Sequence, residues 1–457
     1  MHFHSKSIEE HEEAPLADDG RWEELVAEWS DRRGGKGAAA EASNPCYVVS
    51  VGARRSALEA EAQLAEIVGL VKAQGDEVVG YETHERKRPD PRTYLGRGVS
   101  EAIAERARAC GAELVVVDAE LSPSQLRNLE DMSGFSVCDR EAVILNVFHR
   151  NAKTQQARIQ VEIAHLEYLR PRIHGLGLDM DQQAGGVMSA RGPGETASEL
   201  LARRLDGRLA ELRKAFGRLR RAGETQRKGR EGCQRIVLVG YTNAGKTSLM
   251  NALTAAELSA RDAPFETLDT TSRALARHGG DVLISDTVGF IRRLPERLLA
   301  SFQSTLAEIS EASLVVVVVD ASDPELEMHV ETTEAQLAML GAGETPRLYV
   351  YNKTDRLASP LPQGRLLALS RGRPFVALSS RSSGAVAELR CRLVAAARAR
   401  DRSARIFVPY GAAIFAELYA KCRVSAEESA ERGLYLTIEG EPHVVARIER
   451  ECEGLRR

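Results

Sequence analysis

The segment 240–247 brings together residues that could bind phosphate groups. Its sequence, Gly-Tyr-Thr-Asn-Ala-Gly-Lys-Thr, fits the pattern G-x-x-x-x-G-K-[ST]. The apolar run 236–239 before it is typical of a strand, and the run 248–253 after it is typical of a helix. Glycines let the loop turn its backbone N–H groups around phosphates, and Lys246 adds a full positive charge. Thr247 then supplies a hydroxyl group to Mg2+.

A second segment could hold the metal and the last phosphate. The run 282–285 predicts a buried strand that ends in the sequence Asp-Thr-Val-Gly at 286–289. The carboxylate of Asp286 can hold Mg2+ through water, and the backbone N–H of Gly289 can meet a γ-phosphate.

A third segment could recognise the base. The run 348–351 predicts another strand, and it ends in Asn-Lys-Thr-Asp at 352–355. A carboxylate at Asp355 can accept hydrogen bonds from N1–H and from the exocyclic amine of guanine. Adenine offers no such pair of donors and would leave a buried charge unpaired. We therefore expect guanine as the base.

Each segment alone also has an ordinary structural explanation, because glycine-rich turns and polar strand ends are common. Their order, spacing and strand contexts together favour one nucleotide site. The predicted contacts are Gly240, Tyr241, Thr242, Asn243, Ala244, Gly245, Lys246, Thr247, Asp286, Thr287, Val288, Gly289, Asn352, Lys353, Thr354 and Asp355.

The residue after Gly289 is unusual for such a site. Many small GTPases carry a glutamine there, which orients the attacking water. This chain has Phe290, whose ring can neither donate nor accept the hydrogen bonds that the water needs. A purely packing role would equally explain a phenylalanine. Both explanations predict slow hydrolysis in the absence of a partner.

Length and composition limit the class of protein. With 457 residues the chain should form about three or four domains. Its net charge of −4 excludes a whole-molecule field that attracts nucleic acid or membranes. The seven cysteines are scattered singly, without zinc-binding spacing, which predicts reduced cysteines. No segment approaches ~18 uninterrupted apolar residues, and the start lacks an apolar signal core, so we expect a cytoplasmic protein.

The elements that position these residues can be followed along the chain. Residues 1–45 are polar and then rich in glycine and alanine, which predicts a disordered tail. Residues 46–150 alternate between strand and helix patterns and predict a small parallel or mixed α/β domain. The predicted strands are 47–51, 78–82 and 114–117, and the predicted helices are 58–74 and 100–110.

Residues 151–231 predict an antiparallel helical hairpin with a glycine-rich loop at 173–195. The first arm carries Ile159, Ile163 and Leu166 and should end before Pro171. The second arm opens with a capping box at 196–199. Its apolar positions then recur at steps of four and three, which is typical of a helix packed along one side. They are Leu201, Leu205, Leu209, Leu212, Phe216 and Leu219.

The second arm is strongly basic. A solvated helix face and a nucleic-acid contact both explain such a charge run, and both interpretations stay open on charge alone. The basic residues are Arg203, Arg204, Arg208, Arg213, Lys214, Arg218, Arg220, Arg221, Arg227, Lys228 and Arg230, against the acidic Asp206, Glu211 and Glu224.

The nucleotide segments belong to a predicted domain at 232–396. Residues 397–457 predict a small C-terminal α/β module with strands 405–409 and 434–438 and helices 412–422 and 444–453. The expected fold class is therefore α/β. A P-loop domain is preceded by a small α/β domain and a long helical hairpin, and is followed by the C-terminal module.

From about Cys46 to its end, the chain resembles the HflX family of translational GTPases. The resemblance rests on short phrases that run through all the predicted domains, and Phe290 in place of glutamine is itself a trait of that family. The matching phrases are 121–125, 127–130, 139–140, 160–164, 168, 171–172, 191–196, 286–291, 294–295 and 319–324.

The resemblance implies further site residues. The segment Phe265, Glu266, Thr267, Leu268 and Asp269 is similar to the first switch of the family, whose threonine completes the Mg2+ shell. Thr247 and Thr267 are then the expected metal ligands, and Lys246, Thr267 and Gly289 the expected catalytic groups.

The family closes over the base at a segment that matches Ser379, Ser380 and Arg381 here. The chain also departs from the family pattern. Ser380 replaces an alanine, Thr270 replaces a proline, Ala202 replaces an acid, and the loop 185–191 is one residue longer.

The resemblance implies a GTPase that binds the large ribosomal subunit and its RNA, and that dissociates stalled or idle ribosomes under stress. It places the hairpin loop toward the peptidyl-transferase centre and gives the basic arm RNA phosphates to bind. We expect a monomer without stable membrane association. Two alternatives stay open: a GTPase of large-subunit assembly, and a nucleotide-gated module that acts in signalling.

Overall fold

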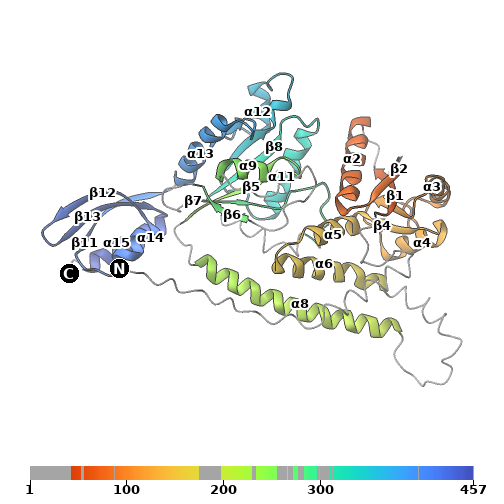
Figure 1. Ribbon diagram of the computed structural model, residues 1–457, viewed down its shortest axis with the longest axis horizontal. Coiled ribbons are helices and arrows are strands. Elements are labelled where there is room, and N and C mark those ends of the chain that lie inside the picture. The colour runs from red at the N-terminus through yellow and green to blue at the C-terminus, as the bar shows by residue number, and fades with distance from the viewer. Residues whose placement is uncertain are drawn as a thin grey trace.

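The described residues form three sheets and a long helical arm, shown as a ribbon in Figure 1. This computed structural model describes residues 43–52, 56–86, 88–173, 197–228, 233–254, 265, 271–275, 282–295, 298, 309, 312–399 and 401–455. The tail predicted at 1–45 lies outside these ranges apart from residues 43–45, and Pro45 already begins the first strand. Within the described residues, no helix is long and apolar enough to cross a membrane.

The N-terminal unit is a four-stranded parallel sheet in the order β2-β1-β3-β4. Cys46 and Val48 of its central strand are buried on one face, and Tyr47 and Val49 are buried on the other. Burial on both faces is typical of parallel sheets covered by helices. The elements are β1 (Pro45–Gly52), α2 (Ala57–Gln74), β2 (Glu77–Glu85), α3 (Arg97–Ala109), β3 (Leu114–Asp118), α4 (Pro123–Ser133), β4 (Ser136–Asp139) and α5 (Arg140–Asn151).

The sequence patterns predicted the first five of these elements but not the last three. The start of α4 carries a local signal, because Ser122 and Gln125 form a capping box and Pro123 occupies the first turn. The strand β4 is only four residues long, which is too short for a two-residue periodicity to stand out. The alternation of strands and helices nevertheless predicted the parallel sheet, and that prediction is confirmed.

The arm consists of α6 (Gln155–Ile173) and the long helix α8 (Ala197–Lys228), which run antiparallel beneath the N-terminal and central units (Figure 1). Leu205, Leu209 and Leu212 of α8 are buried against Ile159 and Leu166 of α6. Ion pairs between the two helices border this seam, with 2.8 Å between Arg208 Nε and Glu162 Oε1. The predicted packing side of the hairpin is therefore confirmed. The glycine-rich loop and the first residue of the predicted capping box lie outside the described residues.

The prediction that the first arm ends before Pro171 is wrong, because α6 continues to Ile173. A proline inside a helix removes one backbone donor. Here the cost is limited because the helix ends two residues later. The guanidinium of Arg172 also donates to the carbonyl oxygen of Tyr168, at 2.8 Å, within the last turn.

The central unit is a six-stranded sheet in the order β10-β9-β8-β5-β7-β6, in which only β6 is antiparallel to its neighbour. The carboxyl ends of β5, β7 and β9 therefore meet at one edge, where the predicted nucleotide segments follow them. The elements are β5 (Gln234–Val239), α9 (Lys246–Thr254), β6 (Thr271–Ala274), β7 (Val282–Asp286), β8 (Leu314–Asp320), α11 (Leu326–Met339), β9 (Arg347–Asn352), η1 (Thr354–Arg356), α12 (Gln363–Leu369), β10 (Phe375–Ala377) and α13 (Ser383–Arg398).

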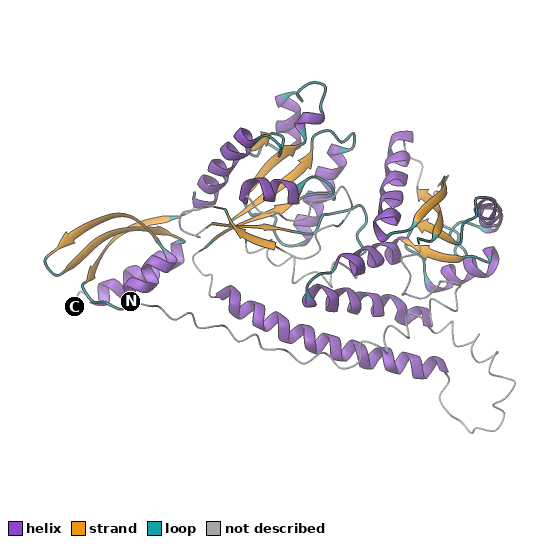
Figure 2. Ribbon diagram, viewed as in Figure 1, coloured by secondary structure: helices purple, strands orange, loops and turns teal. Residues whose placement is uncertain are grey.

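The C-terminal unit is a three-stranded antiparallel sheet in the order β11-β13-β12, with both helices on one face (Figure 2). Its edge strand β12 was not predicted from the sequence, since the run Ser-Ala-Glu-Glu-Ser lacks apolar alternation. Pairing with β13 decides its conformation. The elements are β11 (Arg402–Pro409), α14 (Ile414–Lys421), β12 (Arg423–Ala430), β13 (Gly433–Gly440) and α15 (Pro442–Leu455).

A single apolar cluster joins the N-terminal unit, α6 and the central unit. It contains Ile67 of α2, Val161 of α6 and Val317 of β8. Within this cluster the rings of Phe148 and Phe265 meet edge to face, with centroids 4.7 Å apart. The two sheets that the sequence assigns to separate domains are therefore packed through shared apolar contacts.

Candidate functional site

The phosphate-binding segment turns sharply out of β5 and leads into α9. Gly240 has φ 147°, and a Cβ atom there would lie 2.1 Å from the carbonyl oxygen of Val318. Gly245 has φ 88°, and a Cβ atom there would lie 2.4 Å from Nδ2 of Asn352. Both positions therefore require glycine, as the motif predicts.

Lys246 stands at the start of α9 and is almost fully buried. Its ammonium group donates to the carbonyl oxygen of Gly240 at 3.1 Å and to that of Tyr241 at 2.9 Å. Burial lowers the pKa of Lys246 to about 8, although Asp286 acts in the opposite direction. Phosphate oxygens in the loop would favour the charged form of this amine.

Thr247 and Asp286 lie together where β7 ends. The hydroxyl group of Thr247 donates to Oδ2 of Asp286 at 2.6 Å. A hydroxyl beside a carboxylate is the type of oxygen donor set that Mg2+ prefers. The next residue, Thr287, is buried and bonds the carbonyl oxygen of Leu238 at 2.7 Å, which fixes the end of β7 against β5.

The base-recognition segment is tied to the phosphate loop by Asn352. This side chain is fully buried, and its Nδ2 donates to the carbonyl oxygen of Ala244 at 3.1 Å. Its Oδ1 accepts from the backbone N–H of Ser380 at 3.0 Å. One amide therefore holds the phosphate loop and the segment after β10 in a fixed relation.

Lys353 also contacts the phosphate loop, and it links this loop to the end of β8. Its ammonium group donates to the carbonyl oxygen of Asn243 at 2.6 Å and pairs with Asp320 at 2.8 Å. The sequence motifs assigned no site role to Asp320. Its carboxylate at the end of the buried central strand β8 was the signal that could have indicated one.

Asp355 lies beside the residues that were predicted to close over the base. A hydrogen bond with the Ser379 side chain is the main cause that lowers the pKa of Asp355. The guanidinium of Arg381 lies 3.6 Å from its Oδ2. The backbone N–H of Thr354 also donates to Leu378, at 3.3 Å. All these residues therefore gather at one edge of the sheet, with Asp355 kept ionised.

The segment after β7 lies directly on the phosphate loop. The backbone N–H of Phe290 donates to Gly240 at 3.0 Å, and its carbonyl accepts from the N–H of Thr242 at 2.8 Å. The side chain of Phe290 is 2 % exposed, and Val288 is also buried. Phe290 is thus a packing residue, as one of the two sequence explanations held.

The predicted first-switch segment is described only at its first residue. Phe265 is 3 % exposed, and its carbonyl accepts from Nδ2 of Asn151 at 2.9 Å. Its ring packs on Phe148 of the N-terminal unit, and a nucleotide contact at Phe265 stays a prediction. Glu266, Thr267, Leu268 and Asp269 lie outside the described residues.

Replacing Phe290 with glutamine should change GTP turnover without a partner by less than about threefold. The new amide would enter an apolar cluster instead of facing a water molecule beside a phosphate. Steady-state phosphate release at saturating GTP measures the effect. A rise of tenfold or more would mean that the missing amide is the sole limit on turnover.

Three family models match successive parts of the chain. They are described as GTP-binding GTPase N-terminal over residues 61–149, GTP-binding GTPase Middle Region over 151–230, and 50S ribosome-binding GTPase over 235–353. These ranges correspond to the N-terminal unit, the arm and most of the central unit.

Several relatives are similar over most of their own length. GTPase HflX of Gluconacetobacter diazotrophicus is 38 % identical over 428 residues, which cover 85 % of this chain and 93 % of that protein. GTPase HflX of Spirochaeta thermophila is 43 % identical over 312 residues, or 68 % of this chain and 76 % of that one. GTPase HflX of Escherichia coli is 39 % identical over 297 residues, or 64 % and 70 %.

Among solved structures, a GTP-binding protein from Sulfolobus solfataricus in complex with GDP is 21 % identical, with a TM-score of 0.43. That match covers 77 % of this chain and 98 % of the other. The family assignment rests on the sequence relatives and on the three family models. The chain therefore belongs to the HflX family of GTPases and is a GTP hydrolase.

Proposed function

We propose that this GTPase binds the large ribosomal subunit and dissociates stalled or idle ribosomes. The observation that carries the proposal is the basic arm. Its helix α8 ends at Lys228, and the strand that leads into the phosphate loop begins at Gln234, so the arm directly precedes the nucleotide site along the chain. The match of residues 235–353 to a family described as 50S ribosome-binding GTPase supports the choice of partner. A ribosomal partner also implies a cytoplasmic location.

The exposed side of α8 is suited to RNA phosphates. Its buried side faces α6, so the remaining side is directed to solvent. Lysine and arginine at such positions displace counterions from RNA, which gives affinity that falls as salt rises. The exposed basic residues are Arg203, Arg204, Arg213, Lys214, Arg218, Arg220 and Arg221.

Several of the predicted nucleotide contacts have a proposed role at the edge of the central sheet. Lys246 balances the charge that grows on the γ-phosphate, and the N–H of Gly289 meets the same group. Asp355 accepts from guanine, and Asn352 holds the two halves of the site together. A bound Mg2+ would neutralise phosphate charge, and Thr247 and Asp286 are placed to hold it, with Thr267 proposed as a further ligand.

Water positioning is the step that this site lacks on its own. Phe290 is buried and no water-orienting amide follows Gly289, so hydrolysis should be slow until a partner provides a group that positions the water. We infer that the large subunit provides this group. The test is GTP hydrolysis measured with purified large subunits, small subunits, whole ribosomes and free ribosomal RNA.

Stimulation by mature large subunits, together with GTP-dependent splitting seen by light scattering, supports the proposal. Stronger stimulation by assembly precursors would instead indicate an assembly GTPase. Stimulation by neither would contradict a ribosomal role.

Reversing the charge of Arg204, Lys214 and Arg218 together should reduce ribosome-stimulated turnover at least about tenfold at moderate salt. All three side chains are exposed, and the arm packs through its opposite side, so folding should be preserved. Intrinsic turnover without ribosomes should stay within twofold. The plot of log affinity against log salt should also become less steep.

The matched control reverses Arg97, Arg365 and Arg392, which are exposed on α3, α12 and α13. It makes the same change in net charge away from the arm. Equal losses in the two triple variants would show that the total charge matters and that α8 has no special role.

A further inference from the structure

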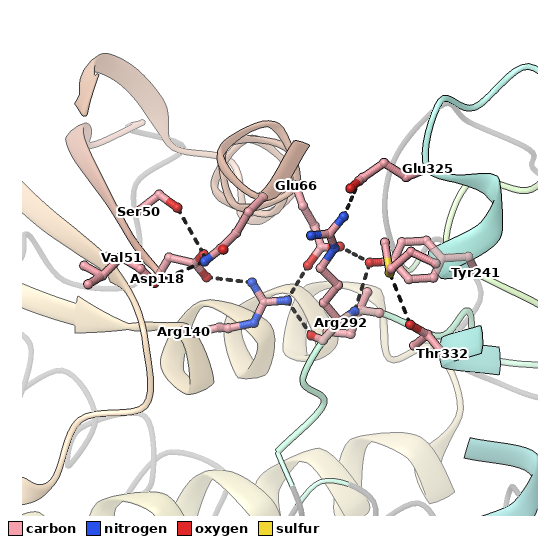
Figure 3. A network of polar contacts seen from close by, with 12 residues as sticks. Ser50, Val51, Glu66, Asp118, Arg140, Tyr241, Arg292, Glu325 and Thr332 are labelled. Carbon is pink, nitrogen blue, oxygen red and sulfur yellow. Dashed lines mark hydrogen bonds and ion pairs between the residues drawn. The ribbon is translucent and has the colours of Figure 1, made fainter. Parts of the chain in front are cut away.

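Tyr241 is the second residue of the phosphate-binding segment, yet its side chain leaves that segment toward the N-terminal unit (Figure 3). It is buried, and its ring stacks on His329 of α11 with centroids 3.7 Å apart. Its hydroxyl oxygen accepts from the backbone N–H of Arg292 at 2.9 Å. The same hydroxyl group donates to the carboxylate of Glu66 on α2. One phenol therefore joins the phosphate loop, the segment after Gly289 and the N-terminal unit.

Arg140 of the N-terminal unit also bonds the backbone at Arg292. It begins α5, and its side chain is 2 % exposed. One terminal nitrogen donates to the carbonyl oxygen of Arg292 at 2.6 Å and also to Glu66. The other donates to Asp118 at 2.6 Å. Both polar groups of the backbone at Arg292 are thus bonded, the N–H by Tyr241 and the carbonyl by Arg140.

The rest of this segment is held residue by residue. Phe290 pairs with Gly240 and Thr242 through its backbone. The carbonyl oxygen of Ile291 accepts from Gln336 at 3.2 Å, and the side chain of Arg292 pairs with Glu325. These contacts leave little freedom in residues 290–292, which follow Gly289.

These contacts fix where Gly289 lies. A Cβ atom at Gly289 would be 2.9 Å from Nζ of Lys246 and 2.9 Å from Cα of Thr242. Gly289 is therefore held against the lysine that would hold the last phosphate. A protein group that contacts a ligand contributes more to affinity when the folded protein already holds that group in position, because binding then carries no cost of ordering it.

We propose that Tyr241, Glu66 and Arg140 are positioning residues that hold Gly289 ready for the γ-phosphate, and so set the preference for GTP over GDP. The inference rests on the proposed nucleotide site. GDP has no γ-phosphate and makes no use of Gly289 in that site. Loosening the segment should therefore weaken GTP and leave GDP almost unchanged.

Burial strengthens the electrostatic interactions of these contacts. The side chains of Glu66 and Arg292 are about 10 % exposed, so salt screens their interactions little. Removing only the hydroxyl of Tyr241 keeps the stacked ring and leaves Glu66 paired with Arg140. The variant therefore tests the hold on Arg292 without leaving a buried charge unpaired.

The experiment measures the dissociation constants of fluorescent GDP and of a fluorescent, non-hydrolysable GTP analogue with the full chain. Tyr241→Phe should weaken the analogue about five- to tenfold and change GDP by less than twofold. Because both ligands are measured on the same variant, GDP reports whether the fold and the rest of the site are intact.

The matched control is Tyr349→Phe. Tyr349 is also fully buried, and its hydroxyl also donates to a buried glutamate, Glu334, that is paired with Arg347. All these groups belong to the central unit and take no part in the contacts between Tyr241, Glu66, Arg140 and Arg292. This variant should bind both nucleotides within twofold of the unsubstituted chain.

A double-mutant cycle tests the route through the N-terminal unit. Glu66→Gln should weaken the analogue as well, and combining it with Tyr241→Phe should cost clearly less than the product of the two single effects. Independent effects would overturn the inference, as would equal losses of GDP and analogue. Tighter binding of the analogue would also overturn it, since the contacts of Tyr241, Glu66 and Arg140 would then oppose GTP binding. Unchanged affinity of Lys246→Ala for both nucleotides would instead refute the proposed site itself.

Discussion

Replacing Lys246 with alanine should reduce GTP turnover at least about 100-fold. The lysine is the only full positive charge that the phosphate loop itself contributes, and its ammonium group is bonded to the carbonyl oxygens of Gly240 and Tyr241 in that loop. Charge on the phosphates grows in the transition state, so the loss should be larger for hydrolysis than for binding. Single-turnover hydrolysis with excess enzyme measures the chemical step directly.

Lys72→Ala removes an exposed lysine from α2 and should leave turnover unchanged. Circular dichroism should give the same spectrum for both variants. Full turnover by Lys246→Ala would show that another site hydrolyses GTP.

Replacing Asp355 with asparagine should lower GTP affinity by about 10- to 100-fold and raise the affinity for xanthosine triphosphate. An amide presents a donor where the carboxylate accepted, and xanthine offers a carbonyl oxygen in place of the exocyclic amine of guanine. The low pKa of Asp355, caused mainly by the Ser379 hydrogen bond, keeps the native group ionised near neutral pH. Competition between the two nucleotides for the protein measures the change in preference.

Discrimination against ATP should weaken in the same variant, because the carboxylate that adenine would leave without a donor is gone. Asp131→Asn makes the same substitution at an exposed position on α4 and should keep the preference for GTP. Retained GTP selectivity in Asp355→Asn would mean that a different residue reads the base.

The strands around the nucleotide site could be predicted from the sequence with little error. The runs at 236–239, 282–285 and 348–351 all proved to be parallel strands of one sheet. Uninterrupted apolar runs of this length are typical of strands buried on both faces. Since parallel strands present their carboxyl ends at one edge, the polar segments after them had to meet there.

Elements that depend on distant partners were harder to predict. The strand β12 has an exposed, charged sequence, and it is a strand because β13 offers it hydrogen bonds. Helix α6 continues through Pro171 because Arg172 bonds the last turn and also pairs with the buried Asp139 of the N-terminal unit at 3.0 Å. Neither the pairing of β12 with β13 nor the contacts of Arg172 can be predicted from local sequence propensity.

The sequence by itself determined the nucleotide chemistry of this protein. The residues proposed to bind phosphate and base belong to short segments in which neighbours along the chain act together, so spacing alone reveals them. Only the tertiary structure decided how the N-terminal unit meets the phosphate loop. Tyr241 and Glu66 are 175 residues apart, and Arg140 and Arg292 are 152 apart. Their contact depends on how two folded sheets pack across an apolar cluster, and that packing leaves no periodic signal in either segment.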